Sequence, residues 1–252
     1  MNRHFAPGAR VRAIVLTALA LSLSAGPARA QVLLGYLFGE LLSTPTFNVG
    51  FEIGVNFATF DGLEGAERTN NTVFGLFADW RFSEHVHLAG AVLPIASRAA
   101  DGITPLPTGD PDIDGQTADG TMMRSLSYVE IPILLKWAPQ RHSGFRVGAG
   151  PSLGIVTGAT DRYTATTAGG APYVLERDIA GEVPGLDVGL SVDVEYRLPI
   201  LSIAARYTHG LTDLRQTGTA TAIHSRVLTG TGRIYLGKKP GAAPPDSSSA
   251  GR

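Results

Sequence analysis

The chain has 252 residues, with 21 Lys and Arg against 22 Asp and Glu, 31 glycines and no cysteine. This charge balance argues against a nucleic-acid partner. The lack of cysteine excludes a disulfide framework and a lipid-anchored N-terminal cysteine. The many glycines disfavour a helical protein, because glycine weakens helices.

The first 30 residues have the three parts of a secretory signal peptide. Three arginines precede an apolar run at 13–25, and a small-x-small cleavage site occupies 28–30. The apolar run is too short for a transmembrane helix, so a retained N-terminal anchor is the less favoured alternative. Cleavage would remove four basic residues and no acidic one, leaving 17 basic against 22 acidic residues and a net charge of −5.

Residues 31–45 (QVLLGYLFGELLSTP) form a lead-in segment that is apolar without clean alternation. An interfacial helix, a lead-in strand and a segment tucked into the mouth of a barrel would each fit this pattern. The sequence does not choose among the three.

Residues 46–60 (TFNVGFEIGVNFATF) alternate strictly along the chain. Aromatic and aliphatic side chains fall on one side of a two-residue period, and Asn, Gly, Glu and Ala fall on the other. This pattern predicts a β-strand with one apolar face and one polar or small face.

Seven further segments show a similar two-residue pattern. They predict strands at 72–82, 86–96, 127–137, 144–156, 185–198, 201–210 and 223–236. The connections alternate in length. Long loops are predicted at 61–71, 97–124, 157–182 and 211–222, and short turns at 83–85, 138–143 and 199–200. Residues 237–252 are predicted to be a disordered polar tail.

The even number of strands and the alternating connections are typical of bacterial outer-membrane proteins, which have short periplasmic turns and long external loops. No segment after the signal has eighteen uninterrupted apolar residues, so helical spans are not expected. We therefore predict an all-β fold, an eight-stranded antiparallel up-and-down transmembrane β-barrel over residues 46–236, placed in outer-membrane lipid. The alternative is a soluble eight-stranded barrel, which would carry its charges outside.

Charged residues on the polar faces form a matched set of six acids and six bases. We predict that they fill the barrel interior, because eight strands leave a lumen that side chains occupy rather than an open pore. The predicted interior set is Glu52, Asp79, Arg81, Glu130, Lys136, Arg146, Asp187, Asp193, Glu195, Arg197, Arg206 and Arg233.

Aromatic residues gather at the strand ends beside the short turns. Such clustering is typical of an aromatic girdle at a membrane interface. The predicted girdle comprises Phe47, Trp80, Phe82, Trp137, Phe145 and Tyr196.

Four segments, FNVGFEIGVNFATF, YVEIPILLKW, FRVGAGPSLGI and AARYTHGLTDL, resemble in order and spacing the PorT-like family of outer-membrane β-barrel proteins. The resemblance covers nearly all of the chain after the signal. It implies an eight-stranded barrel. The family's namesake is linked to protein secretion, and most members have no assigned role. One departure is that Tyr235 and Leu236 precede a sixteen-residue tail, whereas barrel proteins commonly end on an aromatic in the last strand.

One motif suggests a metal site. Asp110, Asp112, Asp114 and Gly115 have the D-x-D-x-D-G spacing of calcium loops. However, the twelfth position is Thr121 instead of a bidentate Glu, and no helices are expected to flank the motif. An acidic loop is the favoured interpretation, calcium binding is the alternative, and no other cofactor is predicted.

Histidine, serine and aspartate occur near the predicted loops without a defined catalytic pattern. His209 with Asp213, and Ser225 beside His224, would form a hydrolase site only if the fold brought them together. The H-x-H pair beginning at His85 lacks a third metal ligand, and H-E-x-x-H does not occur. No enzyme is therefore expected.

The predicted function is a non-enzymatic scaffold that displays four external loops for binding, with other envelope proteins as its partners. Two alternatives remain open. One is a small passive channel or a secretion or transport accessory barrel, and the other is an outer-membrane enzyme acting on lipid or peptide.

Overall fold

The structure is a computed structural model. It describes residues 44, 46–108, 110–117, 119–139, 144–166, 170–198, 201–215 and 221–236. The predicted signal peptide at 1–30, the lead-in segment at 31–45 apart from Thr44, and the predicted tail at 237–252 lie outside the described residues.

The described residues form strands and one short helix. The strands are β1 (Phe47–Asp61), β2 (Glu67–Arg81), β3 (Val86–Ile103), β4 (Thr121–Trp137), β5 (Phe145–Thr166), β6 (Pro172–Asp178), β7 (Leu186–Arg197), β8 (Leu201–Gly210) and β9 (His224–Leu236), and the helix is α3 (Pro111–Thr117). Every strand pair is antiparallel.

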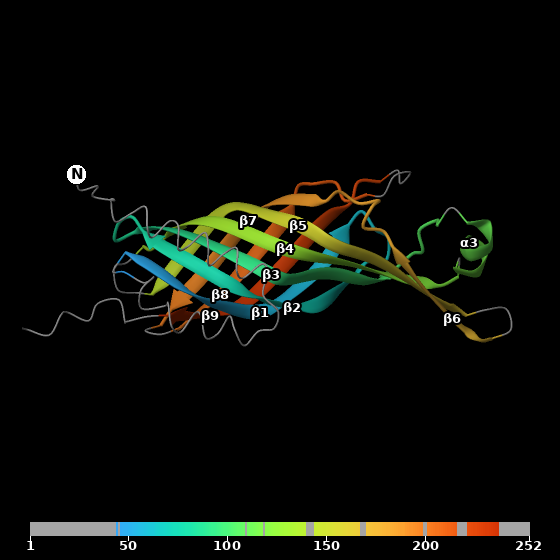
Figure 1. The fold of residues 1–252 in the computed structure, drawn as a ribbon, viewed down its shortest axis with the longest axis horizontal. Helices are drawn as coiled ribbons and strands as arrows, with labels where there is room; N and C mark the ends of the chain where they lie inside the picture. The colour runs from blue at the N-terminus through green and yellow to red at the C-terminus, as the bar shows by residue number, and fades with distance from the viewer. Residues whose placement is uncertain are drawn as a thin grey trace, which may run out of the picture.

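Eight of these strands close into a barrel (Figure 1). The order runs β4-β3-β2-β1-β9-β8-β7-β5, and a β4–β5 ladder joins its two ends. The prediction of an eight-stranded antiparallel barrel is confirmed. We call the end with the short connections after β2, β4 and β7 the turn end, and the opposite end the loop end.

β6 is a ninth strand outside the ring. It pairs with the part of β5 that extends beyond β7, from Thr160 to Thr166. Figure 1 shows β6 and α3 projecting together from the loop end of the barrel. The prediction of loops at 157–182 and 97–124 was therefore wrong in part, because β5 and β6 form a hairpin and β3 and β4 each extend into their connection. β2 likewise begins at Glu67, within the loop predicted at 61–71.

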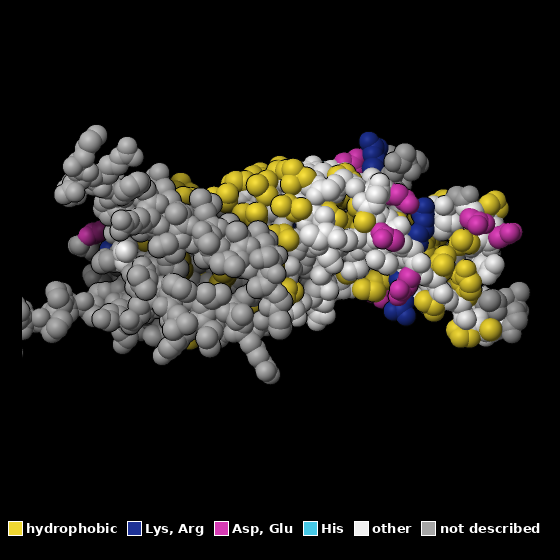
Figure 2. Space-filling view, in the orientation of Figure 1, with side chains coloured by type: hydrophobic (Ala, Val, Ile, Leu, Met, Phe, Trp, Pro, Cys, Tyr) yellow, Lys and Arg dark blue, Asp and Glu magenta, His cyan; other side chains and the backbone are white. Residues whose placement is uncertain are grey.

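The outside of the barrel carries an apolar belt (Figure 2). Large apolar side chains such as Ile53, Leu135, Leu190 and Ile203 are 52%, 58%, 56% and 61% exposed. Toward the loop end, the outward positions become polar, and Figure 2 shows charged side chains gathering there. An exposed apolar band of this kind is what a barrel wall presents to lipid.

Among the residues that the structure describes, no helix is long and apolar enough to cross a membrane.

Inward-facing glycines make room for large side chains in the lumen. A Cβ atom on Gly148 would lie 2.7 Å from Cγ of Lys136, and one on Gly154 would lie 2.8 Å from the ring of Tyr128. Because both contacts are shorter than packed atoms allow, these glycines let Lys136 and Tyr128 lie across the interior.

The loop half of the interior is an apolar core. Its fully buried members include Phe60, Ile103, Met122 and Tyr163, which come from β1, β3, β4 and β5. The connections add further members from outside the strands: Leu63, Ile179, Val183, Leu214 and Ile223. The connections thus fold over the loop end and pack against the strands.

Candidate functional site

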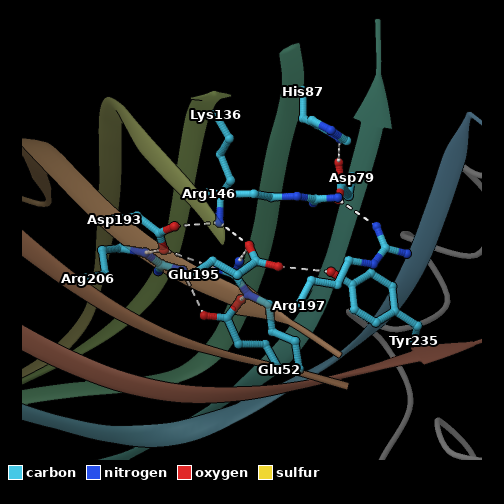
Figure 3. Close-up of polar contacts among 11 residues, drawn as sticks. Glu52, Asp79, His87, Lys136, Arg146, Asp193, Glu195, Arg197, Arg206 and Tyr235 are labelled. Carbon is cyan, nitrogen blue, oxygen red and sulfur yellow. Dashed lines mark hydrogen bonds and ion pairs between the residues drawn. The ribbon is translucent and has the colours of Figure 1, made fainter. Parts of the chain in front are cut away.

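An ionic network fills the turn half of the barrel interior (Figure 3). Arg206 of β8 and Arg233 of β9 each donate to one oxygen of Glu52 on β1, at 2.8 Å. Arg233 also donates to Oε2 of Glu195 on β7, again at 2.8 Å. Arg233 therefore links β9 with β1 and β7. Charge-assisted hydrogen bonds of this length are stronger than neutral ones.

Lys136 of β4 connects the opposite wall to the same network. Its Nζ atom lies 2.5 Å from Oδ1 of Asp193 and 2.5 Å from Oε2 of Glu195, both on β7. The side chain of Lys136 is fully buried. The hydroxyl of Tyr235 donates to the other oxygen of Glu195, at 3.0 Å.

Asp79 of β2 is the centre of a second group near the turn end. Its Oδ2 atom accepts a hydrogen bond from Arg146 at 2.6 Å and lies 3.6 Å from a guanidinium nitrogen of Arg197. Nδ1 of His87 lies 3.1 Å from its Oδ1 atom. The guanidinium of Arg197 also stacks 4.1 Å from the ring centre of Tyr235, which joins the two groups.

Arg98 of β3 forms a separate cluster nearer the loop end. It donates to Asp187 at 2.6 Å, to Glu130 at 3.1 Å and to the hydroxyl of Ser225 at 2.8 Å. Its guanidinium lies 4.4 Å from the ring centre of Tyr128. This one buried arginine therefore connects four strands of the barrel: β3, β4, β7 and β9.

A bidentate ion pair lies among the apolar side chains of the loop half. Arg124 of β4 donates to both oxygens of Asp161 on β5, at 2.8 and 2.7 Å, and both side chains are almost fully buried. Because the two residues are near neighbours across one ladder, this pair fastens β4 to β5 beyond the apolar belt.

Most of the charges predicted to lie inside the barrel do so. Ten are buried: Glu52, Asp79, Glu130, Lys136, Arg146, Asp187, Asp193, Glu195, Arg206 and Arg233. The side chain of Arg197 is 14% exposed. The prediction that Arg81 lies in the interior was wrong. Arg81 is exposed at the last position of β2, where the barrel wall ends and an inward-facing side chain reaches water.

Several interior residues were not predicted from the sequence. Arg98, Arg124 and Asp161 lie in segments that were predicted to be loops, and His87 lies in the strand predicted at 86–96 but was not assigned to the interior. The two-residue alternation of buried and less buried positions is unbroken along β4, so extending the strand predicted at 127–137 would have found Arg124. In β3 and β5, a register irregularity precedes Arg98 and Asp161 and reverses which alternate positions face inward. Extending these two predicted strands with a strict two-residue period would therefore have placed both residues on the outer face.

The predicted aromatic girdle lies on the outer surface at the turn end. Trp80, Phe82, Trp137 and Tyr196 are each about half exposed, at 49%, 55%, 53% and 52%. Phe145 is opposite Tyr196 in the β5–β7 ladder. Phe47, which is only partly exposed, is opposite Trp80 in the β1–β2 ladder.

The calcium alternative has no support in the structure. Asp110 directly precedes α3, and Asp112 and Asp114 lie in its first turn, so the three carboxylates spread around the start of a helix. Oδ1 of Asp110 caps the amide of Asp112 at 3.0 Å, and Oδ1 of Asp114 accepts from the amide and hydroxyl of Thr108 at 2.7 and 2.6 Å. Within the described ranges, no three His, Asp or Glu side chains are placed to hold a metal ion.

The residues considered for a hydrolase site do not converge. Ser225 is buried in the lumen against Asp187, whereas the neighbouring His224 is on the outer side of β9. Asp213 instead accepts hydrogen bonds from the amides of Ile223 and Arg215. Alternation along a strand separates the serine from the histidine, so no Ser-His-Asp arrangement forms here.

The ionic network leaves little open space. A cavity lined by Phe77, Asp79, Glu195, Arg206, Arg233 and Tyr235, among others, has a volume of about 10 Å³. Such a volume holds about one water molecule. An ion crossing the barrel along this route would have to displace the buried ion pairs.

Three solved structures are distantly similar to this chain. The barrel of Ail from Yersinia pestis, solved in complex with the heparin analogue sucrose octasulfate, has 9% identity and a TM-score of 0.40, covering 76% of this chain and 99% of Ail. Neisserial surface protein A has 11% identity and a TM-score of 0.36, covering 74% and 96%. OprG from Pseudomonas aeruginosa has 12% identity and a TM-score of 0.30, covering 78% and 100%.

No curated protein matches the sequence. Residues 43–216 match the family model of the outer membrane protein beta-barrel domain. The match covers more than half of the chain, and the closed ring of antiparallel strands agrees with it. The chain therefore belongs to the outer-membrane protein β-barrel family and is a protein of the bacterial outer membrane.

Proposed function

We propose that the protein is a non-enzymatic outer-membrane scaffold whose loop end binds a partner outside the cell. The observation that carries the proposal is the filled lumen. Charges on seven of the eight wall strands are joined across it in the turn half, and apolar side chains close it at the loop end. The projecting hairpin and α3 then provide the surface for binding.

Three finer points belong to this proposal. Residues 1–30 are a signal peptide that is cleaved during export. The chain is a member of the PorT-like branch of the family, a proposal that the resemblance of the four segments quoted above supports. Its partners are outer-membrane lipid and other envelope proteins. Mass spectrometry of protein purified from outer membranes tests the first point, because cleavage predicts an N-terminus at Gln31.

Planar-bilayer recording tests the scaffold against a small passive channel. The filled lumen predicts no steady single-channel current, whereas a porin reconstituted in the same way supplies the positive control. A reproducible, ion-selective conductance would instead assign the protein to the channel class.

A further inference from the structure

The free edge of β6 is the feature that the barrel does not use. β6 pairs with β5 on one side, and no strand of the described chain pairs with its other side. Figure 1 shows it projecting at the loop end, beyond the ring of eight strands. A closed barrel has no edges, so this is a sheet edge in a fold that otherwise eliminates them.

The direction of the backbone groups along this edge follows from one hydrogen bond. The amide of Ile179 donates to the carbonyl of Ala159 on β5, at 2.9 Å. Because N–H and C=O groups alternate in direction along a strand, the odd-numbered residues of β6 point at β5 and the even-numbered residues point away. The groups of Val174, Glu176 and Asp178 therefore face outward.

Pro172 agrees with this assignment. It is the first residue of β6 and has an even number, so its ring occupies an outward position where β5 needs no donor. Proline is tolerated at strand starts and on edges for this reason. The ladder between β5 and β6 is therefore complete, and only the outer edge lacks partners.

The hairpin is held in place, so its edge is pre-formed. Tyr163 on β5 is fully buried and donates to the carbonyl of Leu106, at 3.2 Å. Leu175 of β6 packs against the apolar core, and Arg177 forms a 2.8 Å ion pair with Glu182. An edge that is already ordered loses less conformational entropy when it binds.

The side chains along the edge select a type of partner. Val174 is 50% exposed. Glu176 has a side chain that is 65% exposed and only a long 3.8 Å contact with Arg162. Asp178 is exposed two residues further on the same face. A neighbouring strand would thus meet an apolar position followed by two carboxylates.

We propose that the free edge of β6 binds an extended segment of another protein, which adds to the sheet as a further strand and is basic on one face. Main-chain hydrogen bonds to Val174, Glu176 and Asp178 provide affinity, and lysine or arginine opposite the two carboxylates provides selectivity. This inference rests on the proposed function and names the partner class. A second copy of this chain fits less well, because it would bring an equally acidic edge against the first.

The probe is a fluorescent, end-capped peptide, Thr-Lys-Thr-Lys-Thr-Val-Thr, added at low salt to the full protein in lipid nanodiscs. In antiparallel pairing, its valine is opposite Val174 and its lysines are opposite Glu176 and Asp178. One analogue carries N-methyl groups on both lysines, whose amides face β6. A matched analogue carries them on the two threonines that follow the lysines, whose amides face away.

Fluorescence anisotropy should show binding of the parent peptide and of the threonine-methylated analogue. The lysine-methylated analogue should lose at least about tenfold in affinity, because it cannot donate to the edge. Val174→Pro should cause a similar loss and Val174→Thr should not, since only proline removes the outward amide. Glu176→Lys should weaken the basic peptide and strengthen its Lys-to-Glu analogue.

Equal binding of the two methylated peptides, or no binding of the parent peptide, would overturn the inference even if Val174→Pro did not fold. Conductance measurements separate this failure from failure of the scaffold proposal. A silent barrel that ignores the peptide removes only the β6 site, whereas a conducting barrel that binds the peptide removes only the scaffold.

Discussion

The two halves of this barrel place polar and apolar side chains on opposite faces of the same strands. In the turn half, β1 places Glu52 inside and Ile53 outside. In the loop half, the same strand places Phe60 inside and Asp61 outside. The register of β1 with β9 is continuous between these positions, so the strand keeps its orientation and only the chemistry of its faces changes.

β4 shows the same change. Lys136 is buried and Leu135 exposed near the turn end, whereas Met122 is buried and Thr121 exposed near the loop end. The medium outside explains this, because lipid requires apolar side chains on the outer face and water does not. The loop half is therefore built like a water-soluble β-protein that stands on a membrane barrel.

The largest expected effect is loss of an interior charge in the turn half. Glu52→Ala would leave Arg206 and Arg233 buried beside each other without their shared carboxylate. We expect a loss of about 3–5 kcal/mol of unfolding free energy, measured by urea unfolding in lipid vesicles. Glu176→Ala is the control, since that carboxylate is exposed, and it should change the free energy by less than about 0.5 kcal/mol. Equal effects would contradict an ionic interior.

Removing an apolar side chain from the loop half should act on that half alone. Ile103 is fully buried in the apolar core, so Ile103→Ala should cost about 2–5 kcal/mol of local stability. Limited proteolysis should then cut the chain beyond the belt faster, while the turn half keeps its heat-modifiable mobility in electrophoresis. Loss of heat-modifiability would show that the two halves unfold as one unit.

A charge placed on the outer face should locate the boundary between the halves. Ile53→Arg puts a cation into the apolar belt and should cost about 2–4 kcal/mol of unfolding free energy. Thr59→Arg places the same side chain on the same face of β1, six positions nearer the loop end, and should cost less than about 1 kcal/mol. Equal costs would mean that lipid extends over the loop half.

The smallest expected effect is a pH dependence in the loop over the barrel end. The amide of Ile223, followed by the amide and guanidinium of Arg215, lowers the pKa of Asp213 below its usual range. A lowered pKa stabilises the folded loop above the unfolded pKa of about 4, and the contribution disappears as pH falls through the folded value. Proteolysis of this loop by an acid-active protease should therefore accelerate at low pH. Asp213→Asn should remove the dependence.

The sequence was sufficient to predict the turn half because lipid imposes a regular apolar stripe on its outer face. That stripe placed β1, β7 and β8 almost to the residue and assigned Glu195 and Arg206 to the interior. The wrong interior assignment there is at the rim, where Arg81 has the inward position but reaches water.

The loop half could not be predicted in the same way, because no lipid stripe marks it. Thr164 and Arg162 on the outside of β5 resemble loop residues, although the alternate residues Tyr163 and Asp161 are fully buried. Pairing of β6 with β5 depends on contacts that no local pattern records. The ion pair of Arg124 with Asp161 was missed for the same reason.

Depth measurement along β5 tests the central claim most directly, because this strand passes through both halves. The chain lacks cysteine, so single-cysteine variants can be spin-labelled without background at Val147, Leu153, Arg162 and Thr164. All four positions face outward in the structure. We predict that oxygen relaxes the labels at 147 and 153 while a water-soluble nickel complex relaxes those at 162 and 164. A water-exposed label at 153, or a lipid-exposed label at 164, would contradict the account.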